Sequence, residues 1–297
     1  MKTFSRFIAV LAVFWSFNVS HAQIKVMQDS TYIFEMKDGN TYVGKVNIIE
    51  KDEIYEVRTN VGVLTIRQEN IVMVKKASDE NIKKGEYWMT NPHSSRYFYS
   101  PSGYGLRKGE GYYQNAWIFF NQVSYGFSDY FTMGAGIMPL FLFGFDEAIP
   151  VWITPKINIP YQNGKGAFGA GSILFGALGS EGSDQGIGIL YGTNTFGTRD
   201  KQLTLGIGFG YSTEEGFSDL PVFNASGLVR TGKNWAFVSE NYFFTFDDFG
   251  ALISGGARYM GKRLAIDMGG FIPVFGGIDR VVILPWLSLS VPFGKRY

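Results

Sequence analysis

The sequence predicts an all-β protein, in which a transmembrane antiparallel β-barrel of about 12 strands follows a small five-stranded β-barrel-like module. Three observations predict the large barrel. Most of its expected strands are about 10–12 residues long, whereas about 9–11 residues cross a membrane as a tilted strand and soluble strands average about 5–6. Large apolar residues alternate with small or polar ones along these strands. Short and long connections also alternate, as in barrels with short periplasmic turns and longer outer loops.

Residues 1–22 have the pattern of a secretory signal peptide. Lys2 and Arg6 form a basic start, residues 7–17 are apolar, and Ser20-His21-Ala22 is a small-x-small cleavage sequence. The apolar run is shorter than the roughly 20 residues of a membrane-spanning helix, so we expect export and cleavage rather than a transmembrane anchor. The chain has no cysteine, which excludes disulfides, thiol catalysis and Cys-ligated zinc.

Residues 29–76 carry a denser set of charges than the rest of the chain and are expected to form the small module. The pattern MKDGNTYVGKV … GVLTIRQENIVMV, with Gly44 in the second strand, resembles Sm-like and SH3-like small barrels. Sm-like proteins often bind RNA, but the acidic run 50–56 and an exported location argue against that activity here. We expect a periplasmic module that makes packing or protein contacts, followed by a linker over residues 77–95. The five expected strands are 32–36, 42–49, 54–59, 63–67 and 71–74.

Residues 96–297 are expected to form the large barrel. Its clearest strand covers residues 203–211, where large apolar residues occupy the odd positions and Thr204 or glycine the even ones. We expect the glycine face to line the lumen and the apolar face to contact lipid. The twelve expected strands are 97–105, 112–127, 130–141, 150–161, 166–178, 186–197, 202–212, 221–231, 234–246, 250–260, 264–274 and 281–293.

This region resembles Gram-negative outer-membrane β-barrel proteins. The segment KGEGYYQNAWIFFNQVSYGFSDYFTMGAG is similar to one in an uncharacterised group of such barrels, and the ending LSLSVPFGKRY partly fits their terminal targeting signal. Lys295 departs from that signal. The resemblance implies residence in the outer membrane, contact with its lipids and insertion by the barrel assembly machinery.

The sequence offers little for catalysis. Of two histidines, His21 leaves with the signal peptide and His93 precedes the first expected strand, so barrel strands alone cannot supply a Ser-His or Asp-His site. Oxygens of Glu214, Glu215 and Asp219 suit calcium, although a solvated loop is the simpler interpretation. We therefore expect no metal and no cofactor. With 27 basic and 26 acidic residues, the chain also gives no electrostatic reason to expect nucleic acid as a partner.

Charged residues on the expected inner face give two possible roles. They line a pore and set its ion preference, or they form ion pairs and hydrogen bonds that plug a barrel too narrow to conduct. We expect a non-catalytic outer-membrane barrel with a structural or small-solute pore role. The alternatives are a secreted or periplasmic all-β protein that binds a lipid-like ligand, and a barrel hydrolase that acts on lipid. The lumen-facing candidates are Lys156, Arg230, Glu240, Arg258 and Asp267.

Overall fold

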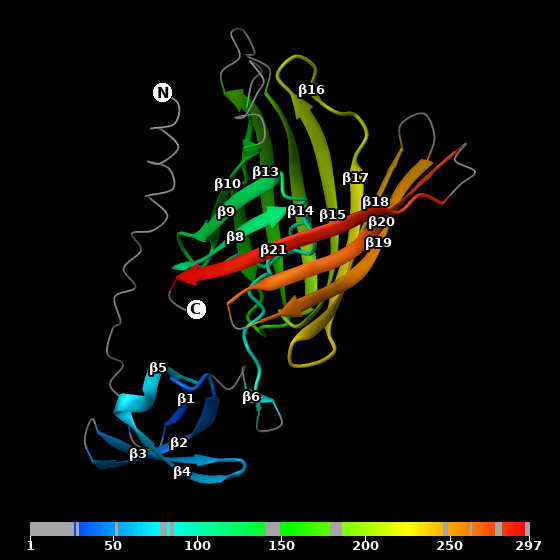
Figure 1. Ribbon diagram of the computed structural model, residues 1–297. Helices are drawn as coiled ribbons and strands as arrows, with labels where there is room; N and C mark the ends of the chain where they lie inside the picture. Colours follow the sequence, from blue (N-terminus) through cyan, green and yellow to red (C-terminus); the bar gives the residue numbers. More distant parts are fainter. Residues whose placement is uncertain are drawn as a thin grey trace, which may run out of the picture. The chain divides into compact units, whose positions relative to one another are not determined.

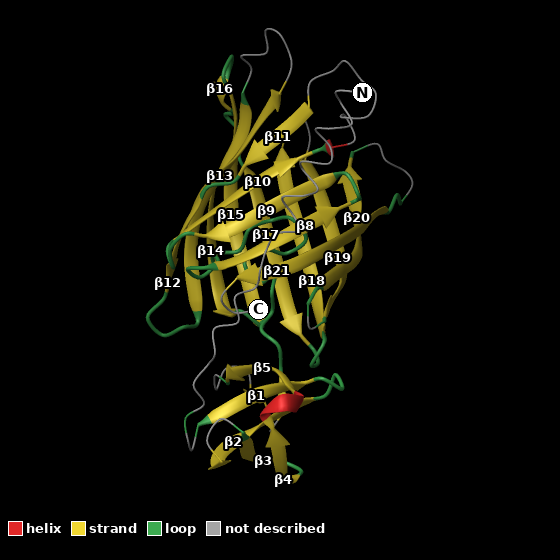
Figure 2. Ribbon diagram, turned by 60° about the vertical axis from the view of Figure 1, so that its left-hand side comes forward, coloured by secondary structure: helices red, strands yellow, loops and turns green. Residues whose placement is uncertain are grey.

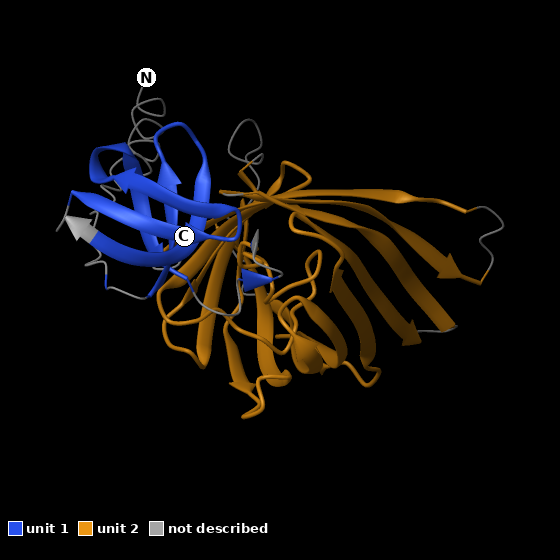
Figure 3. Cartoon of the chain, turned by 90° about the horizontal axis from the view of Figure 1, so that it is seen from below, with its two compact units in different colours: residues 1–87 blue, residues 88–297 orange. Residues whose placement is uncertain are grey.

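The computed structural model describes two compact units, Met1–Tyr87 and Trp88–Tyr297 (Figure 3). The described residues are 27, 30–50, 53–77, 82–83, 86–139, 149–178, 186–245, 249–261, 263–276 and 281–294. The signal peptide expected over residues 1–22 lies outside them. Within these ranges no helix has the length and apolar character needed to cross a membrane.

The first unit contains one five-stranded antiparallel sheet, as the sequence predicts. Its order is β4-β3-β2-β1-β5, and a 3-10 turn, Gln68–Asn70, precedes the last strand. Alternate residues of these strands, including Phe34, Val46 and Val57, form a buried core. Gly44 permits the close approach of β2 to β3, because an added Cβ would clash with the Arg58 carbonyl oxygen. The strands are β1 Thr31–Met36, β2 Thr41–Glu50, β3 Ile54–Thr59, β4 Gly62–Arg67 and β5 Ile71–Lys76; a separate pair is β6 Ile82–Lys83 with β7 Glu86–Tyr87.

The second unit is a closed antiparallel barrel of twelve strands (Figures 1 and 2). Two segments, β11 and β12, share one position between β10 and β13 and count as one interrupted strand. The first and last strands pair from Glu110↔Gly294 to Ala116↔Ser288, which closes the ring. The segments are β8 Glu110–Ala116, β9 Phe120–Gly126, β10 Phe131–Ile137, β11 Ile149–Ile153, β12 Lys156–Pro160, β13 Gly166–Leu178, β14 Ile187–Thr198, β15 Lys201–Ser212, β17 Val222–Arg230, β18 Trp235–Thr245, β19 Phe249–Met260, β20 Ala265–Phe275 and β21 Leu284–Gly294, with a short β16, Gly216–Phe217, on β15.

The expected first barrel strand, 97–105, is wrong. These residues form no strand and lie inside the barrel, with Tyr97 and Phe98 fully buried. The expected strand 112–127 is instead two strands, β8 and β9, so the two errors cancel in the strand number. The turn between them is hidden in the sequence because it contains no glycine, asparagine or proline. Trp117 and Ile118 adopt φ values of 49° and 68° there, a conformation that such residues rarely take.

The alternation expected for residues 203–211 is confirmed in β15. Leu203 is 52% exposed and Ile207 40%, whereas Gln202 and Thr204 are buried toward the barrel interior. The same outward exposure of large apolar residues recurs on most other strands, including Phe223, Phe237 and Leu287. The barrel therefore has an apolar outer surface and a lumen lined by the opposite set of side chains.

Strand connections divide the barrel into two ends. At one end, called the turn end, the joins over 127–130, 161–165, 199–200, 231–234 and 261–264 are short, and β8 begins and β21 ends there. At the other, called the loop end, most joins are longer, with 138–148, 213–221 and 276–283 among them. The predicted alternation of short and long connections holds with two exceptions at the loop end, the tight β8–β9 turn and the three-residue join 246–248 between β18 and β19, which the sequence already showed to be short.

Candidate functional site in the barrel lumen

Residues 88–107, called here the lumenal segment, occupy the turn-end half of the lumen. Their only ladder contact is an isolated bridge, Arg96↔Pro101, and a tight turn places the Ser100 carbonyl 2.9 Å from the Tyr97 amide nitrogen. Most of the side chains from Asn91 to Leu106 are buried. Residues 88–95 of the expected linker 77–95 thus belong with the barrel unit, and a plug that the sequence did not predict fills this part of the lumen.

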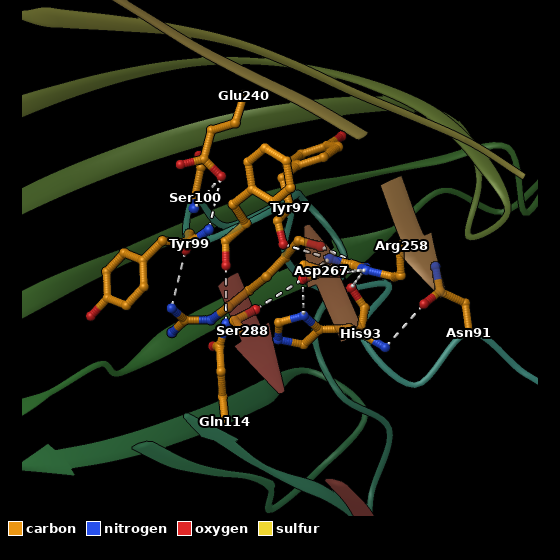
Figure 4. A network of polar contacts seen from close by, with 12 residues as sticks. Asn91, His93, Tyr97, Tyr99, Ser100, Gln114, Glu240, Arg258, Asp267 and Ser288 are labelled. Carbon is orange, nitrogen blue, oxygen red and sulfur yellow. Dashed lines mark hydrogen bonds and ion pairs between the residues drawn. The ribbon is translucent and has the colours of Figure 1, made fainter. Parts of the chain in front are cut away.

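Arg258 on β19 is the centre of the contacts that hold the segment (Figure 4). Its guanidinium donates to the carbonyl oxygens of His93 at 2.7 Å and Tyr97 at 2.6 Å. It also donates twice to the Asp267 carboxylate on β20, at 2.6 and 3.0 Å. Both side chains are fully buried, so the low local dielectric strengthens their attraction, and the guanidinium makes five hydrogen bonds in all, the fifth to the Arg96 carbonyl oxygen at 3.3 Å.

The tip of the lumenal segment is fixed by Glu240 on β18. One carboxylate oxygen accepts the backbone N–H groups of Tyr99 at 2.9 Å and Ser100 at 2.8 Å, and the other accepts the Tyr242 hydroxyl. From β8, the Gln114 amide donates to the Phe98 carbonyl at 3.0 Å. Three consecutive backbone groups at the tip are therefore satisfied by the barrel wall (Figure 4).

Basic residues bind the lumenal segment on both sides of its turn at residues 97–100. The Lys156 ammonium donates to the carbonyl oxygens of Ser102 and Tyr104. Near the turn end, the Arg230 guanidinium donates to the Met89 carbonyl at 2.7 Å, pairs with Asp200 at 3.2 Å and lies over the Trp88 ring. Arg107, which ends the segment, donates its backbone N–H to the Glu110 carboxylate at 2.9 Å.

All five residues singled out from the sequence thus face the lumen, but they do not line open water. Lys156, Arg230, Glu240 and Arg258 bind backbone groups of the lumenal segment, and Asp267 pairs with Arg258. Sequence reasoning missed the residues supplied by the segment itself and several that contact it from strands β8 and β14 and from the turn after β14. The available signal was the short polar run from Asn91 to Arg96, which carries the one histidine beyond the signal peptide. The missed residues include His93, Arg96, Gln114, Thr195 and Arg199.

His93, Asp267 and Ser288 lie together but do not form a hydrolytic site. The His93 Nδ1 and Asp267 Oδ2 atoms are 3.7 Å apart, too far for a hydrogen bond, and both ring nitrogens are buried without a hydrogen-bond partner. Ser288 donates to the same carboxylate at 3.3 Å, and Arg258 occupies both of its oxygens. All three side chains are buried, so a substrate has no access to them. Among the described residues no group of acidic or histidine side chains is arranged to hold a metal ion.

Burial makes His93 a source of acid sensitivity. It lowers the pKa of the imidazole from 6.5 to about 4. Between these two pH values the folded protein keeps the ring neutral, whereas an unfolded chain would bind a proton there. A depressed folded pKa means that stability is complete above about pH 6.5 and is lost as the pH falls toward 4, by roughly 3 kcal/mol for one proton.

Replacing His93 with glutamine is therefore expected to flatten the fall in stability between pH 6.5 and 4. Urea unfolding followed by tryptophan fluorescence at pH 7, 5.5 and 4 measures it, with the wild-type chain alongside. Asp267 and Glu240 are present in both proteins, so the difference between the two pH curves reports the His93 side chain together with its interaction with Asp267. Parallel pH curves for the two proteins would show that His93 binds its proton at the same pH in the folded and the unfolded chain.

Comparisons with known proteins assign no family to the chain. No protein-family model and no curated protein matches it. Among solved structures it is similar to a KdgM porin in complex with disordered oligogalacturonate, with 8% identity, a TM-score of 0.42, and coverage of 63% of this chain and 98% of that one. A NanC porin gives 12% identity, a TM-score of 0.36, and coverage of 64% and 98%. A loop-deletion mutant of OmpT, an outer membrane protein of Vibrio cholerae, gives 14% identity, a TM-score of 0.37, and coverage of 89% and 96%.

Proposed function

We propose that this protein is an outer-membrane β-barrel whose lumen is closed by its own lumenal segment, with a structural and non-catalytic role in this closed state. Placement in the membrane is supported by the apolar outer surface and by strands of 11–13 residues over most of the ring, from β13 to β15 and from β18 to β21. Export by residues 1–22 is part of the same proposal. Outer-membrane lipids and, during insertion, the barrel assembly machinery are the partners it implies.

The observation that carries the closed state is the set of hydrogen bonds to the lumenal segment. A pore lined by ions needs charged side chains that water and solutes can reach. Here Lys156, Glu240 and Arg258 are buried and form hydrogen bonds with main-chain groups of that segment. A small-solute pore, the second candidate, would require the segment to leave. Its contacts with the wall are non-covalent, so such a release breaks no covalent bond.

Replacing residues 93–105 with a Gly-Ser linker of equal length is expected to convert a silent barrel into a conducting one. The replacement removes the buried rings of Tyr97 and Phe98 and uncovers the charges around Arg258. Single-channel recording in planar bilayers measures the effect, and heat-modifiable gel migration verifies that the variant barrel is folded. Replacing residues 213–219 at the loop end with a Gly-Ser linker of their own length serves as the control, and this variant should stay silent. Steady conductance by the wild-type chain would contradict the closed state.

For the first unit, we propose an SH3-like or Sm-like small barrel that makes protein contacts in the periplasm. The sheet order β4-β3-β2-β1-β5 supports this, because the last strand returns to the first after a 3-10 turn. Its surface exposes acidic residues such as Glu53 and Glu69 as well as basic ones, and Glu69 pairs with Arg67, so nothing in its charge favours nucleic acid.

A further inference from the structure

The loop-end half of the lumen is lined by apolar side chains that remain exposed. On β14, Thr195 faces inward because its hydroxyl accepts the Gly103 N–H, and Ile187 and Ile189 share that face by strand alternation. They are 57% and 42% exposed. On the β20–β21 side, Phe271 and Trp286 face inward against the Phe98 ring, and Phe275 and Leu284, 40% and 42% exposed, share their faces.

This half of the lumen contains no charge among the described strand residues. Every inward-facing charged residue on those strands contacts the lumenal segment or its ion pair instead. Six residues make up that charged set: Glu110, Lys156, Arg230, Glu240, Arg258 and Asp267. A polar solute entering from the loop end would therefore find no ionic partner, whereas a hydrocarbon chain would lose no hydrogen bond.

Aromatic rings connect this region to the outside of the barrel. Phe98, at the tip of the lumenal segment, forms its floor and lies 5.8 Å from the Trp286 ring centroid. Trp286 in turn lies 5.2 Å from Trp117, in the turn between β8 and β9. Phe120 adds a second route, with ring centroids 6.1 Å from Trp117 and 6.0 Å from Trp152. The chain of rings passes from the lumen to the rim without a polar gap.

The rim is low where this path reaches it. Strands β8, β9 and β10 have 7 residues each, whereas β13 has 13 and β15 has 12 (Figure 1). The turn over residues 117–119 is apolar, and Ile118 is 77% exposed. Its left-handed φ values are costly for Trp and Ile, and a hairpin turn ordinarily uses Asn or Gly at such positions. Apolar residues at this site therefore point to contact with an apolar phase rather than to turn formation.

We propose that the loop-end half of the lumen binds a long acyl chain, which enters over the β8–β9 turn. The outer surface that would face lipid is continuous with the exposed residues 117–119 and, through Trp117 and Trp286, with the apolar lumen. Entry from the membrane rests on the proposed function, whereas binding of the chain does not. A phospholipid and a free fatty acid present the same hydrocarbon, so both sources are included in the test.

Tryptophan quenching by bromine attached to an acyl chain tests this directly, because quenching requires near contact. One variant of the full chain keeps Trp286 as its only tryptophan after the signal peptide, and a second keeps Trp235, which is exposed on the outer face of β18. Each is measured in vesicles of brominated phosphatidylcholine and, separately, in unbrominated vesicles with brominated stearate added. Heat-modifiable migration verifies folding.

We expect brominated lipid to quench Trp235 in the first arm, and Trp286 fluorescence to fall to half or less in one arm or both. Ile189→Glu should restore Trp286 fluorescence to more than about four fifths, while Ile189→Leu should not; Leu284→Glu is the substitute if Ile189→Glu does not fold. Quenching of Trp235 without any quenching of Trp286 would overturn the acyl-chain site. Quenching of Trp286 by stearate without quenching of Trp235 would support the site and contradict the membrane-spanning barrel.

Discussion

Replacing Arg258 with alanine is expected to lower the free energy of unfolding by about 3–5 kcal/mol and to release the lumenal segment. The change leaves the Asp267 carboxylate buried without its charged partner, which is the costliest way to break a buried ion pair. It also removes the donors to the His93 and Tyr97 carbonyl oxygens. Urea unfolding gives the free energy, and the rate of tryptic cleavage after Arg96, buried in the wild-type chain, reports release of the segment.

The double variant Arg258→Ala/Asp267→Ala separates the two causes. If the unpaired Asp267 carboxylate accounts for most of the lost stability, removing it as well should raise the free energy of unfolding by at least about 1 kcal/mol relative to the single variant. Arg258→Lys should fall between wild type and alanine, since an ammonium keeps the charge but cannot reach five acceptors as the guanidinium fork does. A double variant less stable than Arg258→Ala would show that Asp267 contributes through other contacts.

The barrel was accessible to sequence reasoning because its information is local. The alternation of side chains along a strand shows which residues share a face, so Lys156, Arg230 and Asp267 could be assigned to the lumen from their immediate neighbours. The twelve strands were counted correctly only because two local errors cancelled. The turn at Trp117 and Ile118 lacks the residues that mark turns, and the buried run around Tyr97 resembles a strand in composition.

The lumenal segment could not be predicted from the sequence because its conformation depends on partners that are distant along the chain. Tyr99 binds Glu240 and His93 binds Arg258, at separations of 141 and 165 residues. A short irregular segment has no period of its own, and its backbone groups are satisfied only by the wall around it. For the same reason the inward charges could be located from sequence while their role, lining a pore or holding a plug, could not be decided.

Replacing Ile207 with arginine is expected to destabilise the barrel by about 2–4 kcal/mol in lipid, if the site lies near the bilayer midplane. Ile207 is near the middle of β15, points outward and pairs with Gly192 and Phe223 on the adjacent strands. The neighbouring Gly208→Ser is the matched control. Its added Cβ would lie 3.2 Å from the Cγ2 methyl of Ile189, which needs to shift by only a few tenths of an ångström, so we expect a loss below about 1 kcal/mol.

Urea unfolding in vesicles and in detergent distinguishes the physical cause of the Ile207→Arg loss. A lipid-facing arginine is costly because hydrocarbon cannot solvate its charge. The difference in unfolding free energy between the two variants should therefore shrink in small micelles, where water reaches the apolar outer surface of the barrel. Equal losses for the two substitutions in vesicles would mean that β15 does not turn its large residues toward lipid. The apolar outer surface would then need a different covering, such as a protein partner, and the outer-membrane assignment would fail with it.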